Sequence, residues 1–248
     1  MLTKEMYQRY SRQLLVEQFD ETAQQRLHNA SVLIIGAGGL GCAAAQYLAG
    51  SGVGHLLIMD HDNVDLSNLQ RQPLYREADV GKNKAESAAR QLLTLNSEIR
   101  ISPLVYQATP ALLEALMPVV DIILDCTDNL PTRLMINEAA YYFDKPLFIG
   151  AASGNLAQFI ALSPRQRHGC YACLYSPDQH TGNNCLTQGI LGPVVAIAGN
   201  YQALAALYYL SNINTPEWGQ LHVFDGMKMQ WSQYAIPKRA NCSICGDR

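Results

Sequence analysis

The chain has 248 residues, of which 48% are hydrophobic, and a formal net charge of −3. This length and composition suffice for the core of a large α/β domain, and the mild negative charge does not predict binding to nucleic acid. No apolar stretch is long enough to span a membrane, and the charged N-terminus lacks the apolar segment of a secretory signal. Seven cysteines without such a signal favour a protein of the reducing cytoplasm over a disulfide-bonded one.

Helix-like and strand-like segments alternate through the first part of the chain. Residues 3–28 are expected to form one or two short helices. Strands are then expected at residues 32–35, 56–59, 99–106, 122–124, 146–150 and 158–162. Helices are expected between them, at residues 40–50, 82–95, 109–117 and 131–143. This alternation predicts an α/β fold with a doubly wound, mostly parallel sheet.

The pattern changes after residue 158. A polar segment at 164–184 is followed by a long apolar helix at 187–210 and by late strands at 221–225 and 230–236. Polar residues interrupt the apolar helix, so we interpret it as buried in protein rather than in a membrane. These segments predict an antiparallel C-terminal extension on the same core.

A glycine-rich loop lies between the first strand and the helix that follows it. The run SVLIIGAGGLG holds Gly36, Gly38, Gly39 and Gly41, and Asp60 ends the next apolar run, HLLIMD. In a Rossmann-like fold such glycines permit the turn, the approach of phosphate and close helix packing, and the acidic residue binds ribose hydroxyls. The loop therefore predicts nucleotide binding. The alternative is a purely structural turn.

The residues after Asp60 carry more positive charge than a dinucleotide requires. Asn68, Arg71 and Lys84 follow it. Arginine forms a planar fork on phosphate oxygens, and lysine supplies a point charge. Because the chain has no G-x-x-x-x-G-K-[ST] loop, we expect these side chains to hold a triphosphate instead. The alternative is a solvated loop and a surface helix that carries Lys82 and Lys84.

Two carboxylates follow the apolar strand near residue 124. Asp125 and Asp128 lie in the segment LDCTDN, and the carboxyl ends of strands line the ligand crevice of open α/β sheets. Mg²⁺ prefers one or two carboxylates together with substrate phosphates. We expect Asp128 to be the ligand of Mg²⁺ and Asp125 to have a structural role. The alternative is that one of them only caps the following helix.

Four of the seven cysteines form two C-x-x-C pairs, Cys170 with Cys173 and Cys242 with Cys245. Two such pairs match a tetrahedral zinc site with four thiolate ligands. Because thiolates fill every position, the zinc would be structural, tying the C-terminus to the middle of the fold. The alternatives are a redox pair and unrelated core thiols.

Two further features are interpreted from their positions. Cys185 lies in a polar segment just before the expected long helix, and a helix N-terminus lowers the pKa of a thiol, which favours a nucleophile. Arg9 and Arg12 lie on the N-terminal helix, far in sequence from the expected crevice. Taken from the residues alone, both are surface charges.

In combination, these segments resemble the ThiF/MoeB family of adenylyltransferases, which activate ubiquitin-like sulfur carrier proteins. The resemblance rests on RYSRQ at 9–13, GAGGLG at 36–41, DLSNLQRQ at 65–72, LDCTDN at 124–129, the two C-x-x-C pairs and FDG at 224–226. The surroundings of Cys185 and of Gln230-Trp231 are more similar to ThiF than to MoeB. One departure is Asn83, where the family usually has proline before the lysine.

The resemblance implies a set of site residues. The ATP-binding positions would be Gly36, Gly38, Gly39, Gly41, Asp60, Asn68, Arg71, Lys84, Asp128 and Asn129, with Asp128 also holding Mg²⁺. Arg12 would reach the nucleotide of the partner subunit in a homodimer, which replaces its interpretation as a surface charge. The catalytic residues would be Arg71, Lys84, Asp128, Arg12 and Cys185.

The implied reaction is attack of a carrier's C-terminal glycine carboxylate on the α-phosphate of ATP, which gives an acyl-adenylate and pyrophosphate. Cys185 would act later, on the acyl-adenylate or in sulfur transfer. The expected carrier ends in Gly-Gly and is of the ThiS type, for thiamine thiazole synthesis. The alternative is the small subunit of molybdopterin synthase. A sulfurtransferase or cysteine desulfurase is a further expected partner.

On this interpretation residues 1–248 form a single adenylyltransferase domain. It comprises N-terminal helices (1–30), a nucleotide-binding α/β part (31–152) and a carrier-binding and zinc part (153–248). Two other functions remain as alternatives. An NAD(P)-dependent oxidoreductase would leave Arg71 and Lys84 unexplained. A non-catalytic scaffold for the carrier would be free to lose those two residues and Asp128.

Overall fold

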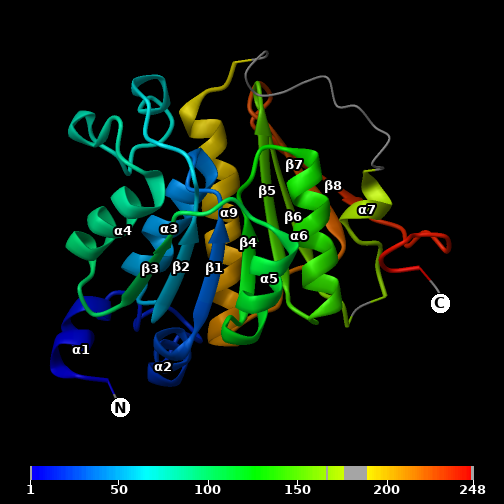
Figure 1. Ribbon diagram of the computed structural model, residues 1–248. Coiled ribbons are helices and arrows are strands. Elements are labelled where there is room, and N and C mark those ends of the chain that lie inside the picture. The colour runs from blue at the N-terminus through cyan, green and yellow to red at the C-terminus, as the bar shows by residue number, and fades with distance from the viewer. Residues whose placement is uncertain (1, 166, 176–188, 247–248) are drawn as a thin grey trace.

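One continuous sheet forms the centre of the molecule (Figure 1). The computed structural model describes residues 2–165, 167–175 and 189–246. Within these residues the sheet has eight strands in the order β3-β2-β1-β4-β5-β6-β7-β8. The strands are β1 (Ser31–Ile35), β2 (His55–Met59), β3 (Arg100–Leu104), β4 (Ile122–Asp125), β5 (Leu147–Ser153), β6 (Leu156–Leu162), β7 (Gln220–Asp225) and β8 (Gln230–Ala235). Strands β1 to β5 pair in parallel, which confirms the expected doubly wound arrangement.

Helices cover both faces of this sheet (Figure 1). The α-helices are α1 (Lys4–Tyr10), α2 (Glu21–Asn29), α3 (Gly39–Gly50), α4 (Lys84–Leu95), α5 (Pro110–Leu116), α6 (Leu130–Tyr142), α7 (Tyr171–Leu174) and α9 (Gly192–Ser211). Short 3-10 turns lie at Leu66–Asn68, Glu77–Asp79 and Met117–Val119. Helices α5 and α6 cover one face, and α3, α4 and α9 cover the other.

The parallel strands are apolar along their whole length because both of their faces are buried. In β1, Val32 and Ile34 belong to the core beneath α3 and α9, whereas Leu33 and Ile35 belong to the core beneath α5 and α6. All four are at most 3% exposed. Strands buried on both faces have this continuous apolar pattern, and it identified β1, β2 and β4 in the sequence.

The last three strands form the expected antiparallel extension. Strand β6 pairs antiparallel with β5 and β7, and β7 pairs antiparallel with the edge strand β8. On the face toward α9, Phe159 and His222 are register partners, and both rings contact Tyr201 of α9. The next ring outward is Trp231 of β8, which also contacts Tyr201. This aromatic layer joins the extension to the helix that packs on the parallel half.

The expectation for the long apolar helix needs one correction. Residues 189–191 are not helical, and α9 begins at Gly192 rather than at residue 187. Pro193 lies in the first turn, where its missing N–H removes no hydrogen bond, so the helix can begin there. Its buried face packs on α3, β5 and β6, as expected for a helix buried in protein.

Among the described residues, no helix combines the length and the apolar character needed to cross a membrane.

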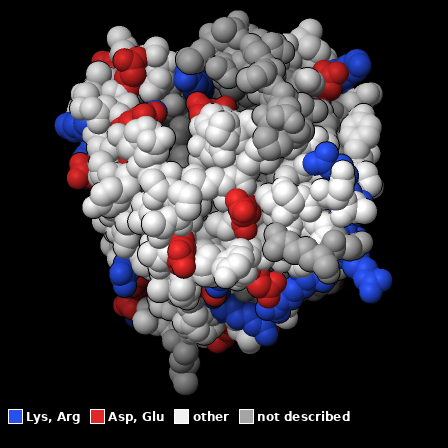
Figure 2. Space-filling view, turned by 45° about the vertical axis from the view of Figure 1, so that its right-hand side comes forward, with Lys and Arg blue, Asp and Glu red and all other residues white. Residues whose placement is uncertain are grey.

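Figure 2 turns the β8 side of the molecule forward. Uncharged side chains cover most of this face, and basic side chains gather along its lower edge (Figure 2). Near the edge strand the exposed apolar side chains are Met227, Met229, Trp231 and Tyr234.

Candidate active site

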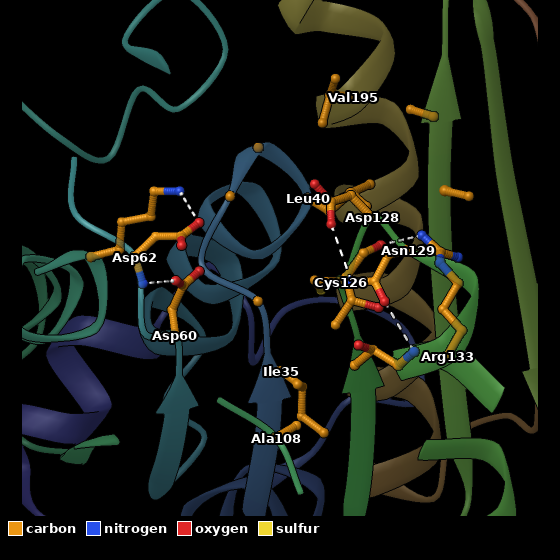
Figure 3. Close-up of a pocket in the computed structure, with 18 of the residues that line it drawn as sticks. Ile35, Leu40, Asp60, Asp62, Ala108, Cys126, Asp128, Asn129, Arg133 and Val195 are labelled. Atoms are coloured by element: carbon orange, nitrogen blue, oxygen red, sulfur yellow. Dashed lines mark hydrogen bonds and ion pairs between the residues drawn. The ribbon is translucent and has the colours of Figure 1, made fainter. Parts of the chain in front are cut away.

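A cavity of about 660 Å³ opens at the carboxyl ends of β1, β2 and β4. Strands β1 and β4 are neighbours, although β2 and β3 lie between them in the sequence, so the chain direction of the crossovers reverses here. In open α/β sheets ligands bind at this switch point. The cavity brings together the expected ATP-site positions apart from Gly41: Gly36, Gly38, Gly39, Asp60, Asn68, Arg71, Lys84, Asp128 and Asn129. Figure 3 shows Asp60, Asp128 and Asn129 among its lining residues.

The glycine loop is closely packed on one side and open on the other. Gly36 has φ +95°, and a Cβ there would lie 2.6 Å from the carbonyl oxygen of Cys126. A Cβ on Gly41 would lie 2.0 Å from the Gly36 carbonyl oxygen. At Gly38 the nearest atom to a Cβ would be 3.7 Å away, so the loop is open where a phosphate would approach. These positions match the three roles expected of the glycines.

Helix α3 begins directly at the cavity. Gly38 is its N-cap residue and makes no side-chain capping hydrogen bond, and Gly38, Gly39 and Leu40 line the cavity. The backbone N–H groups of a helix's first turn have no intrahelical partners and carry partial positive charge. This end of α3 is therefore suited to bind an anion.

Asp60 is fixed against the glycine loop by its own hydrogen bonds. Its Oδ2 accepts from the Ala37 N–H at 2.7 Å, and its Oδ1 accepts from the Asp62 N–H at 2.9 Å. Burial raises the pKa of Asp60, and these backbone N–H groups and Lys84 counteract part of the rise. The carboxylate thus lies at the cavity wall in an orientation set by the backbone (Figure 3).

Lys84 is the first residue of α4 and is 8% exposed. Its Nζ lies 3.1 Å from Asp62 Oδ2, and its N–H donates to the Asp62 carbonyl oxygen at 2.9 Å. The interpretation of Lys84 as part of a solvated helix surface is therefore wrong. Asp62 was missed from the sequence, because only the fold shows that a carboxylate two residues after Asp60 pairs with this lysine.

Asn83 shows what replaces the proline that the family usually has at this position. Its Oδ1 accepts from the Glu86 N–H at 3.2 Å, so Asn83 caps α4. Its Nδ2 donates to the carbonyl oxygens of Asp60 and Asp62, at 3.2 and 3.0 Å. A proline has no side-chain donor or acceptor for these contacts. Asn83 therefore joins the start of α4 to the Asp60 segment.

Arg71 and Asn68 lie on the turn that follows Asp60. Arg71 Nη1 donates to the Ser67 carbonyl oxygen at 3.1 Å, which uses one of its five N–H groups. Asn68 Oδ1 accepts from the Asp65 N–H at 3.3 Å and completes a capping box with Asp65. Both side chains are partly exposed and line the cavity. The segment DLSNLQRQ therefore forms a wall of the site.

The loop after β4 separates the roles of its two carboxylates. Asp125 is completely buried, and its Oδ1 accepts from the N–H and the hydroxyl of Thr127 at 2.9 and 2.7 Å. Asp128 is exposed and lines the cavity (Figure 3). Neither aspartate caps α6, because Asn129 does so through its Oδ1, which accepts from the Thr132 N–H at 3.0 Å. Of the two, only Asp128 has access to a ligand in the cavity.

The four cysteines of the C-x-x-C pairs converge in space. Their Sγ atoms all lie within 4.8 Å of one another, with Cys170 and Cys242 at 3.7 Å and Cys173 and Cys245 at 3.3 Å. Sulfur atoms around a tetrahedral Zn²⁺ are separated by about 3.8 Å, given Zn–S bonds of about 2.3 Å. The alternative of unrelated core thiols is therefore wrong, and the cluster is able to hold a zinc ion.

The pKa shifts of the thiols differ within the cluster. Burial would raise the pKa of Cys242, but the backbone N–H groups of Cys245 and Ile244 lower it to about 6. Burial raises the pKa of Cys170 and of Cys245. Because zinc binds the thiolate form, a bound ion would have to displace the protons of these two thiols. The cluster joins the start of α7 to the C-terminal segment, as expected of a structural clamp.

One expected catalytic residue, Arg12, does not line this cavity. Arg12 is exposed in the turn after α1. In Figure 1, α1 lies below the sheet, whereas α9 begins at the top, beside the site. Arg9 is exposed, as expected of a surface charge, and its Nη1 donates to the Leu95 carbonyl oxygen at the end of α4, at 3.0 Å. Cys185 falls outside the described residues, so its role stays a prediction.

Two further residues that the sequence interpretation missed, Tyr75 and Gln72, lie against the glycine loop. The hydroxyl of Tyr75 donates to the Ala37 carbonyl oxygen at 2.6 Å, and Tyr75 is 3% exposed. Gln72 is also 3% exposed, and its Nε2 is the atom nearest to the open side of Gly38. Gln72 ends the segment DLSNLQRQ, and its place in that motif was the only feature of the sequence that could have indicated a role at the site.

A known family shares this arrangement over almost the whole chain. Residues 10–244 match the model of the ThiF family. The chain belongs to the ThiF family. It is 42% identical over 240 residues to the sulfur carrier protein ThiS adenylyltransferase of Escherichia coli (strain K12), covering 97% of this chain and 95% of that protein. It is 37% identical over 238 residues to the molybdopterin-synthase adenylyltransferase of Salmonella typhimurium (strain LT2), covering 96% of each.

Solved structures agree with this membership. The structure of Escherichia coli MccB with ATP superposes with a TM-score of 0.84 at 27% identity. The match covers 96% of this chain and 73% of the MccB chain. The fold found here is therefore that of ThiF-family proteins, including the antiparallel extension.

Proposed function

We propose that this protein adenylates the C-terminal carboxylate of a ubiquitin-like sulfur carrier protein of the ThiS type, using ATP and releasing pyrophosphate. The observation that carries the proposal is the single cavity that holds the glycine loop, Asp60, Arg71, Lys84 and Asp128. The 42% identity to a ThiS adenylyltransferase over 97% of the chain supports the choice of substrate.

The proposed chemistry needs positioning and charge stabilisation rather than a general base. A carboxylate oxygen of the carrier attacks the α-phosphorus of ATP, a new P–O bond forms, and the bond to the β-phosphate breaks as pyrophosphate leaves. No proton is transferred, because the carboxylate is already ionised. Arg71 and Lys84 would stabilise the negative charge on the phosphates, and the start of α3 would hold them in line.

Asp60 and Asp128 take the remaining roles at the nucleotide. Asp60, which its backbone hydrogen bonds orient, would accept hydrogen bonds from the ribose hydroxyls. Asp128 is the exposed carboxylate of the cavity and would hold Mg²⁺, with Asn129 beside it. When bound, Mg²⁺ would offset the charge of the departing pyrophosphate.

Three further assignments belong to the proposal. Zinc at the four cysteines would be structural and would stabilise the C-terminal segment. As the resemblance to the family implies, Arg12 would act on the site of a second subunit in a homodimer; it does not line the cavity of its own chain. Cys185 would act after adenylation, in transfer to sulfur. The cysteines of the described residues are all free, which fits a reducing cytoplasm.

Pyrophosphate exchange tests the proposal. The protein would be incubated with ATP, Mg²⁺, labelled pyrophosphate and either the ThiS carrier or the small subunit of molybdopterin synthase. We expect label to enter ATP only when a carrier is present, and faster with ThiS. Faster exchange with the molybdopterin carrier would select the alternative substrate, which the 37% identity to a molybdopterin-synthase adenylyltransferase keeps open. No exchange with either carrier would contradict the proposal.

A nicotinamide oxidoreductase is the rival function. Lys84 argues against it, because a buried lysine and Arg71 add positive charge that a two-phosphate cofactor does not require. A thermal shift separates the two: ATP with Mg²⁺ should raise Tm, whereas NAD should not.

A further inference from the structure

The wall of the cavity opposite Lys84 contains a buried arginine that the proposed reaction has not yet used. Arg133 lies near the start of α6, lines the cavity and is 6% exposed. Its side chain extends from α6 toward the loop after β4 (Figure 3). Tyr171, Tyr175 and Gln158 line the same side of the cavity, and they come from α7, the segment after it and β6.

Arg133 is only partly satisfied by the protein. Nη2 donates to the carbonyl oxygen of Thr127, in the loop that leads to Asp128. Nη1 is buried and makes no hydrogen bond of ordinary geometry within the described part of the chain, although the Tyr171 side chain lies beside the guanidinium and interacts with it. Buried donors are nearly always paired, and charged ones most of all. An unpaired guanidinium nitrogen at a cavity wall therefore points to an acceptor that arrives with a ligand.

The guanidinium stays charged, so this acceptor is an anion. Burial alone would lower the pKa of Arg133, but Asp125 and Tyr171 beside it raise the pKa above its ordinary value. Asp125 does not satisfy the guanidinium, because its Oδ1 accepts from Thr127 and its Oδ2 has no hydrogen-bond partner in the described residues. The unpaired nitrogen favours a carboxylate or phosphate oxygen.

The position of Arg133 decides between these two anions. The glycine loop, Arg71 and Lys84 already supply the donors for the phosphates. Arg133 instead lines the cavity with Tyr171 of α7, which interacts with it, and with Gln158 of β6, the first strand of the antiparallel extension. A substrate tail that entered past Gln158 and Tyr171 would bring its carboxylate to Arg133.

We propose that Arg133 is the residue that binds the C-terminal carboxylate of the protein substrate. Nη1 donates to one carboxylate oxygen, while Nη2 keeps the Thr127 carbonyl and thereby the loop of Asp128 in place. The bound carboxylate is partly neutralised, which reduces its repulsion from the α-phosphate, and its second oxygen is left to attack. This assignment rests on the proposed function and extends it to the recognition of the second substrate.

A double-mutant cycle between Arg133 and the carboxylate tests this assignment. Binding of Escherichia coli ThiS would be compared with that of the same protein bearing a C-terminal carboxamide, by titration calorimetry with Mg²⁺ and a non-hydrolysable ATP analogue. We expect amidation to weaken binding to the wild type by about 10- to 100-fold, the range of a charge-assisted hydrogen bond. R133K and R133Q should bind both carriers equally and weakly.

The controls separate contact with substrate from support of the fold. R165K is the matched control, since Arg165 is exposed and pairs with Asp144; it should discriminate between acid and amide as the wild type does. If R133K and R133Q still prefer the acid as strongly as the wild type, or if the wild type does not discriminate, the assignment of Arg133 is wrong. A wild type that binds and adenylates neither ThiS nor the molybdopterin-synthase small subunit overturns the proposed function itself, which is a different result.

Discussion

The nucleotide cavity and the cysteine cluster are built in opposite ways. The cavity collects loops that follow neighbouring parallel strands, and its reactive groups are exposed or only partly satisfied. The cluster joins two segments that are distant in the sequence and satisfies its thiols among themselves. Groups kept free for a ligand add little to stability, whereas a closed metal clamp contributes to stability and takes no part in the reaction. The cavity should therefore control activity and the cluster should control folding.

The largest expected effect is at Asp128. D128A should lower carrier-dependent pyrophosphate exchange by about 1,000-fold or more, because the metal loses its carboxylate while the pyrophosphate still has to leave. Since Asp128 is exposed, Tm should change by less than about 2 °C. Exchange and thermal denaturation measure the two quantities, with D121A as an exposed-aspartate control. A large fall in Tm for D128A would contradict the assignment of activity to the cavity and of folding to the cysteine cluster.

Removal of the proposed zinc should give the reverse pattern. C242S should lower the zinc content below one ion per chain and destabilise the fold by about 3–5 kcal/mol, a fall in Tm of about 10 °C for a chain of this size. Metal analysis and calorimetry report both, and ATP affinity at low temperature should stay within about threefold. C42S changes a buried cysteine outside the cluster and should keep the zinc. Full stability of the zinc-free protein would refute a structural role.

A smaller effect is expected at Asp62, which pairs with Lys84. D62N removes the charge at 3.1 Å from Nζ but keeps a side chain of the same shape. Lys84 should then be less well oriented, and KM for ATP should rise about three- to tenfold with little change in kcat. D144N is the control, because Asp144 is exposed, pairs with Arg165 and does not line the cavity. An unchanged KM would show that Lys84 is positioned by its place in α4 alone.

The smallest effect concerns pH and Asp60. Burial raises the pKa of Asp60, so the folded protein favours the protonated carboxyl over the charged one. The protonated form therefore contributes fully to stability at low pH, and this contribution is lost as pH rises through the raised pKa. ATP binding should have the opposite dependence, since a protonated Asp60 is a poorer acceptor for ribose hydroxyls. ATP affinity measured from pH 7 downward should therefore fall at a higher pH than an ordinary aspartate would cause. D60N should bind ATP weakly at every pH, and an identical pH profile in D60N would contradict this explanation.

Much of the fold was predictable from periodicity. Strands buried on both faces, such as β1 and β4, are continuous apolar runs, and the change after residue 158 marked the antiparallel extension correctly. The start of α9 was placed too early, because apolar composition continues across the helix boundary. Only the first-turn proline at position 193 marks where the helix begins.

The site was predictable to the extent that its residues fall in short motifs. The glycine loop, Asp60, Arg71 and Asp128 follow strand ends, and parallel strands bring such ends together. Asp62 and Arg133 were not predictable, since nothing in their neighbourhoods shows which partner each would meet. The pairing of Asp62 with Lys84 and the unpaired Nη1 of Arg133 depend on how α4 and α6 pack on the sheet.

The sequence by itself determined the order of elements, the nucleotide loop and the four thiols, because each is a local pattern with a local physical cause. Only the tertiary structure decided which groups are buried, which are paired and which remain free. Hydrogen bonding and desolvation depend on neighbours that are distant in the chain, such as Asp125 beside Arg133 or Cys170 beside Cys242. Those neighbours distinguish the buried carboxylate of Asp125 from the exposed one of Asp128, and they leave Nη1 of Arg133 without a hydrogen-bond partner among the described residues.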